Sequence, residues 1–127
     1  MGIRILLLDD EPDLLRALSV RLRAAGYQCD TARNGKEGLA KIAQQHPDLV
    51  ITDLIMPQID GAQFIRYLRA DTRTSNIPVI VLTAVPKHSN LPLDQELGVT
   101  RVIHKPFDSD ELISVVQGIV GAIPSGG

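Results

Sequence analysis

The chain has 127 residues, 44% of them hydrophobic, which is enough for one compact domain that buries roughly 70% of the surface of its unfolded chain. The formal net charge is -2, from 13 basic and 15 acidic residues spread along the sequence, so no basic stripe is available to neutralise a nucleic acid backbone. No apolar run approaches the ~20 residues needed to cross a bilayer. The first residues lack the features of a signal peptide, and the single Cys29 cannot form an internal disulfide. We therefore expect a soluble, cytoplasmic protein with no direct nucleic acid or membrane partner.

An aliphatic run near the start of the chain stops at two acidic residues. Ile3 to Leu8 is interrupted only by Arg4 and is followed by Asp9 and Asp10, which is the pattern of a strand buried on both faces of a parallel sheet. Residues 11–25 open with a proline and acidic residues, carry leucines at helical spacing and stop at a glycine. They are predicted to form a helix.

The alternation of strand and helix continues along the chain. Strands are predicted at 27–32, 48–52, 78–82 and 101–104, and helices at 35–45, 62–70 and 108–120. Pro86 and Pro92 interrupt the stretch before Gly98, so a short or irregular helix is expected there, beginning near Leu91. The segment from Ala122 to Gly127 is rich in Pro, Ser and Gly and is predicted to be a flexible tail after one domain at 1–121.

Five strands that alternate with helices predict a doubly wound α/β domain with a parallel sheet. Ligands of such domains bind at the carboxyl ends of the strands. Polar residues interrupt the apolar runs at these ends, so one site is expected there. Its candidate side chains belong to Asp9, Asp10, Asp53, Thr83 and Lys105.

Clustered carboxylates at this edge require a positive partner. Two unit charges ~4 Å apart at an effective dielectric constant of about 20 repel each other by roughly 4 kcal/mol. Oxygen ligands suit a hard divalent cation, so we expect Mg²⁺ or Mn²⁺ at Asp10 and Asp53, with Asp9 contributing directly or through water.

A carboxylate beside a metal and a lysine is also placed to attack phosphorus. Asp53 is the predicted nucleophile. Lys105 would neutralise the transferring phosphoryl group, and the Thr83 hydroxyl and the Ala84 backbone N–H would donate hydrogen bonds to its oxygens.

Four motifs in order, ILLLDDEPD, DLVITDLIMPQIDG, VLTA and HKPF, carry a family resemblance. Over nearly its whole length the chain resembles the receiver domain of bacterial two-component response regulators. The resemblance implies a flavodoxin-like (βα)5 three-layer sandwich with strand order 2-1-3-4-5. It also implies that a histidine kinase or histidine phosphotransfer protein donates a phosphoryl group to Asp53 with Mg²⁺. Slow self-dephosphorylation would follow, without turnover of a separate substrate.

The resemblance assigns further roles by position. Ile55 would give its backbone carbonyl to the metal, Thr83 would sense the phosphoryl group and Lys105 would bind it, with a cis Lys105–Pro106 peptide bond. Receivers commonly carry an aromatic residue where this chain has Val102, so output through another surface is expected. Because the prolines near Leu91 fall on the family's usual dimer face, a monomer or weak dimer is expected. Apolar Ile55 and Val85 near the mouth of the site predict a long-lived phosphoaspartate.

Two other functions are compatible with parts of the pattern. A phosphatase of the haloacid-dehalogenase kind would also use Asp53 as nucleophile, but it carries a second aspartate two residues later, where this chain has Ile55. A binding module with a purely structural acidic cluster is the other alternative. The histidines at 46, 88 and 104 are given no role, and Cys29 is expected to be a small buried strand residue.

Overall fold

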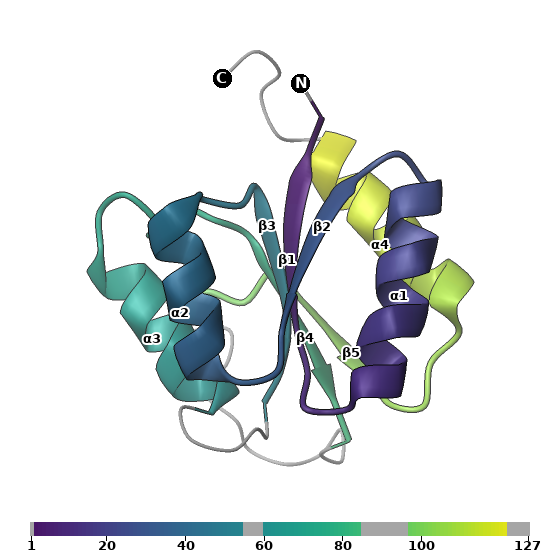
Figure 1. Cartoon of the computed structure of the whole chain (residues 1–127), viewed down its shortest axis with the longest axis horizontal. Helices are drawn as coiled ribbons and strands as arrows, with labels where there is room; N and C mark the ends of the chain where they lie inside the picture. The colour runs from purple at the N-terminus through teal and green to yellow at the C-terminus, as the bar shows by residue number, and fades with distance from the viewer. Residues whose placement is uncertain (1, 55–59, 85–96, 122–127) are drawn as a thin grey trace.

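The computed structural model describes residues 2–54, 60–84 and 97–121, which form a parallel sheet with helices on both faces (Figure 1). The elements in chain order are β1 (Arg4–Leu8), α1 (Pro12–Ala24), β2 (Gln28–Ala32), α2 (Gly35–Gln44), β3 (Leu49–Asp53), α3 (Gly61–Ala70), β4 (Val79–Thr83), β5 (Arg101–His104) and α4 (Ser109–Gly121). The strand order β2-β1-β3-β4-β5 confirms the predicted doubly wound topology. Predicted boundaries differ from these by at most one residue, and the helix expected near Leu91 lies outside the described residues.

The central strands are apolar on both faces because helices cover each face, two on each side in the part of the chain that the structure describes. Within β1, the alternating side chains of Leu6 and Leu8 pack in the core beneath α2 and α3, whereas Ile5 and Leu7 pack beneath α1 and α4. Phe64 of α3 is fully buried in the first of these cores. The near-continuous hydrophobic strands of the sequence are therefore the middle layer of a three-layer sandwich.

Local signals fix where the helices begin. Asn34 caps α2 by accepting a hydrogen bond from the backbone N–H of Glu37, and Asp60 forms a capping box with Gln63 at the start of α3. Asp108 accepts a hydrogen bond from the backbone N–H of Asp110 and so caps α4. These caps mark the first turns of α2, α3 and α4, each of which follows a strand along the chain.

Two smaller expectations, on Cys29 and on the peptide bond before Pro106, are also met. Cys29 is buried in β2, and the Lys105–Pro106 peptide bond is cis. Among the described residues, no helix is both long enough and apolar enough to cross a membrane.

Candidate functional site

The sheet register brings the predicted site residues to one edge. Leu8 pairs with Thr52, so Asp9 and Asp53, the next residue of each chain segment, lie side by side at the carboxyl ends of β1 and β3. Asp53 is in turn in register with Leu82, one residue before Thr83. The backbone N–H of Lys105 donates to the carbonyl oxygen of Thr83 at 2.7 Å, which fixes the start of the loop after β5 beside the end of β4.

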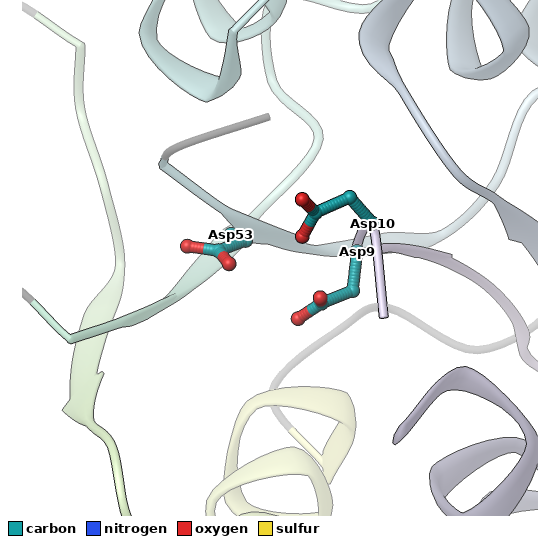
Figure 2. A group of neighbouring side chains, drawn as sticks. All are labelled: Asp9, Asp10 and Asp53. Atoms are coloured by element: carbon teal, nitrogen blue, oxygen red, sulfur yellow. The ribbon is translucent and has the colours of Figure 1, made fainter. Parts of the chain in front are cut away.

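Three carboxylates form the centre of this edge. One oxygen from each of Asp9, Asp10 and Asp53 lies within 4.8 Å of the others, and Figure 2 shows the side chains of Asp9 and Asp10 reaching toward Asp53. Asp9 is completely buried and Asp53 is 7% exposed, whereas Asp10 is open to solvent. The structure thus confirms the cluster predicted from the strand ends, with one carboxylate facing outward.

Lys105 neutralises part of this cluster. Its Nζ lies 2.9 Å from Oδ2 of Asp9 and 3.0 Å from Oδ2 of Asp53, and only 15% of its side chain is exposed. Burial is the largest single influence on the pKa of Lys105 and acts to lower it. Hydrogen bonds and attraction to Asp9 and Asp53 together outweigh burial and raise the pKa. Lys105 therefore stays charged and links the two buried carboxylates.

Sequence reasoning missed the contribution of Glu11 to this site. The backbone N–H of Glu11 donates to Oδ1 of Asp9 at 3.0 Å, and its carboxylate lies 3.6 Å from Nζ of Lys105. In the sequence, this position indicates only an acidic residue that complements the dipole of the first helix. Glu11 follows Asp9 by two residues, which is the spacing of an Asx turn. That spacing could have predicted the hydrogen bond from the backbone N–H of Glu11 to Asp9.

Thr83 and Ala84 border the cluster on the other side. Thr83 is the last residue of β4 and is fully buried, and Ala84, which follows it, is exposed. In the β3–β4 register Asp53 pairs with Leu82, so Thr83 and Ala84 follow its partner by one and two residues at the carboxyl end of β4. The remaining predicted contributions, from the backbone of Ile55 and the side chain of Val85, lie outside the described residues.

Gly61 is a second feature that the sequence alone does not connect to the site. Its N–H donates to the carbonyl oxygen of Leu54 at 2.8 Å, so the start of α3 is held against the residue after Asp53. A Cβ atom at this position would lie 2.1 Å from the carbonyl oxygen of Asp53. Only glycine permits this approach.

The donor set fits a hard divalent cation. All the clustered atoms are carboxylate oxygens, the ligands that Mg²⁺ and Mn²⁺ prefer. One oxygen from each of the three side chains lies within 4.8 Å of the others, so the three carboxylates converge on one small region. Asp10, which is exposed, gives such an ion a path from solvent.

Comparisons with known sequences agree with this geometry. The profile of the response regulator receiver domain matches residues 5–117. The chain is 36% identical over 117 residues to the DNA-binding dual master transcriptional regulator RpaA of Synechocystis sp., covering 92% of this chain and 48% of that protein. It is 33% identical over 117 residues to Protein PilH of Pseudomonas aeruginosa, covering 92% of this chain and 97% of PilH. The chain spans about half the length of most of the curated relatives it matches.

Solved structures give the same result. The signal receiver domain of a signal transduction histidine kinase from Syntrophus aciditrophicus superposes with a TM-score of 0.88 at 31% identity, covering 100% of this chain and 96% of that one. The receiver domain of a sensor histidine kinase from Pseudomonas aeruginosa, which has a magnesium ion coordinated in its active site cleft, superposes with a TM-score of 0.83 at 28% identity, covering 96% and 100%. The chain therefore belongs to the response regulator receiver domain family, which acts in two-component signalling by phosphoryl transfer to an aspartate.

Proposed function

We propose that Asp53 is the phosphoryl-accepting residue of this receiver and that the donor is the phosphohistidine of a histidine kinase or a histidine phosphotransfer protein. The observation that carries this proposal is the position of Asp53. Asp53 is the last residue of β3. Its carboxylate lies beside those of Asp9 and Asp10 and accepts a hydrogen bond from Nζ of Lys105 at 3.0 Å. A carboxylate with a neighbouring ammonium and neighbouring metal ligands can act as a nucleophile toward a phosphoryl group.

Asp9, Asp10 and Asp53 are the proposed ligands of a divalent cation, Mg²⁺ or alternatively Mn²⁺. When bound, the ion would offset the negative charge that gathers on the transferring phosphoryl oxygens. The resemblance to receivers adds the backbone carbonyl of Ile55 as a further ligand. Asp9 is oriented for this role by Glu11, whose backbone N–H donates to one of its oxygens.

Phosphoryl transfer then follows from the chain's own groups. A carboxylate oxygen of Asp53 forms a bond to phosphorus while the phosphorus–nitrogen bond of the donor histidine breaks, and the leaving imidazole takes up a proton. Lys105 offers its ammonium to the incoming oxygens, and the Thr83 hydroxyl and the Ala84 N–H donate to the remaining ones. The product is an acyl phosphate on Asp53.

Phosphorylation of the purified protein tests this assignment. With Mg²⁺ and a phosphorylated donor protein or acetyl phosphate, the native chain should gain one acid-stable, base-labile phosphoryl group. Asp53→Asn should gain none. Asp71→Asn is the matched control, because the carboxylate of Asp71 pairs with the neighbouring Arg73 just after α3, at the opposite end of that helix from the cluster. Labelling of Asp53→Asn at the native level would overturn the assignment.

The apolar residues Ile55 and Val85 support a further proposal, that the phosphoaspartate is long-lived because attacking water is excluded. Loss of the phosphoryl label from the purified protein in Mg²⁺ measures this lifetime. Decay within seconds would contradict the proposal.

The side chain of Val102 packs against the core beneath α2 and α3, and a β-branched side chain has few rotamers to change. The signal is therefore proposed to leave the site by a route that does not use position 102.

A further inference from the structure

A hollow of about 350 Å³ lies between α1, the end of β2 and the start of α2, on the side of the molecule where β2 forms the edge of the sheet. Three arginines line it: Arg16 and Arg23 from α1, and Arg33, the residue after β2. We call it the arginine hollow. Its only acidic lining residue is Glu37, among the residues that the structure describes, so the lining carries an excess of positive charge. That excess contrasts with the formal net charge of the whole chain, which is -2.

Among the described residues, the arginines of the arginine hollow form no ion pair with a carboxylate. Within the described ranges, neither Arg16 nor Arg33 has a carboxylate within 4.0 Å. Arg23 donates a hydrogen bond to the main-chain carbonyl oxygen of Cys29 at 2.7 Å. This contact uses one of its N–H groups but does not neutralise the positive charge of the guanidinium. Other arginines of the chain do pair, as Arg73 does with Asp71.

The remaining lining groups suit a small polar ligand. The Ser19 hydroxyl is buried and donates to the carbonyl oxygen of Arg16, and Thr31 adds a half-buried hydroxyl. The volume falls in the range of about 300–1,000 Å³ that is typical of small-molecule sites and exceeds the needs of a single phosphate. Guanidinium groups match phosphate oxygens with paired hydrogen bonds.

We propose that the arginine hollow binds a small anion that carries two or more phosphate groups. The hollow is separate from the carboxylate cluster and uses none of its residues. The two lie close together, because the backbone N–H of Asp9 donates to the carbonyl oxygen of Ala32, between Thr31 and Arg33. A bound anion would therefore lie beside the phosphorylation site on the open edge of β2.

A structural role for the three arginines is the competing explanation. β2 pairs with β1 on one side only, and charged side chains commonly cover such an edge and prevent pairing with another chain. In that case the guanidinium groups would need no ligand. Binding measurements separate the two roles.

Titration with pyrophosphate tests the proposal, in EDTA and at constant ionic strength so that metal-dependent binding at the carboxylates is suppressed. Calorimetry should show one saturable site in the native chain. The double variant Arg16→Gln/Arg33→Gln should bind about tenfold more weakly or worse, because each charge-assisted hydrogen bond to phosphate is lost. The matched control, Arg73→Gln/Arg101→Gln, changes the net charge equally outside the hollow and should bind like the native chain.

Two results would overturn the proposal: no saturable binding at millimolar pyrophosphate, or the same affinity in both double variants. Either would leave the arginines as a cover for the edge of β2. Nuclear magnetic resonance of the native chain is an independent measurement, since the side-chain N–H signals of Arg16, Arg23 and Arg33 should shift together on titration. Adenosine diphosphate in a parallel titration distinguishes a nucleotide from a free diphosphate by its relative affinity.

Discussion

Gly61→Ala should damage both the stability of the domain and the reactivity of Asp53, because the glycine lies against the backbone that carries the acceptor. The new Cβ would lie 2.1 Å from the carbonyl oxygen of Asp53 and 2.7 Å from Cα of Leu54. Favourable contacts between such atoms begin near ~3.5 Å, so the two backbones must separate by about 1 Å. The clash involves main-chain atoms, which cannot turn aside as a flexible side chain can.

Two magnitudes follow from this displacement. Overpacking costs about 1–3 kcal/mol, and a contact with backbone atoms belongs at the upper end of that range. Displacing a reacting group by about 1 Å lowers the rate of a positioned reaction by roughly 10²-fold. Gly61→Ala is therefore expected to melt several degrees below the native chain and to phosphorylate far more slowly from acetyl phosphate and Mg²⁺.

Gly118→Ala is the matched control for this substitution. Gly118 lies in α4, and among the residues that the structure describes a Cβ atom added there would have no atom within 4 Å outside its own helix backbone and chain neighbours. Alanine at this position should therefore stabilise the helix by about 0.5–1 kcal/mol and leave phosphorylation unchanged. Calorimetric melting and the initial rate of phosphorylation would be measured for both variants. If Gly61→Ala matched the native chain in both measurements, the close approach of Gly61 to Asp53 would not constrain the site and the reasoning would be refuted.

Three further perturbations test the electrostatics. Lys105→Met leaves the buried carboxylate of Asp9 without its ammonium and should lower the free energy of unfolding by about 3 kcal/mol in urea denaturation, whereas Lys41→Met should have little effect. Asp10→Asn should raise the melting temperature in EDTA, because it relieves repulsion between the carboxylates, and it should weaken the stabilisation by Mg²⁺. If Mg²⁺ did not change the melting temperature of the native chain, that result would count against the metal site. Burial raises the pKa of Cys29 from 9.0 to about 11, so the unfolded chain loses the thiol proton first and the free energy of unfolding should fall by about 2 kcal/mol as the pH rises from 9 to 11. Cys29→Ala should remove the loss of unfolding free energy between pH 9 and 11 that is due to this thiol. If the pH profile of stability were the same in Cys29→Ala and in the native chain, the contribution of Cys29 would be refuted.

The sequence predicted the sheet and the acidic cluster well because both depend on local patterns with one physical meaning. Strands buried on both faces must be apolar throughout, so a polar residue such as Asp9 or Asp53 marks the strand end. Parallel pairing then requires that these ends meet at one edge. Nothing beyond hydrophobic periodicity and topology was needed to bring Thr83 and Lys105 to the same place.

What the sequence did not reveal depends on distances between separate segments. The contact of Gly61 with Asp53 arises from how closely the start of α3 approaches the end of β3, which no periodicity encodes. Arg16 and Arg33 are solvent-exposed and lie on different elements, so their convergence on one hollow has no sequence signature. Exposed positions are weakly specified by folding, and their arrangement becomes visible only in three dimensions.

The charge balance of the cluster shows why one lysine is not sufficient for the proposed chemistry. The carboxylates of Asp9, Asp10 and Asp53 carry three formal negative charges. The ammonium group of Lys105 carries one positive charge and contacts both Asp9 and Asp53. Within these three carboxylates two negative charges remain, which one divalent cation would offset, and the carboxylate of Glu11, 3.6 Å from Nζ of Lys105, adds a further negative charge nearby. An incoming phosphoryl group brings further negative charge and competes with the carboxylates for Lys105. A divalent cation at the carboxylates would allow Lys105 to turn toward the phosphoryl oxygens without leaving Asp9 buried and unpaired.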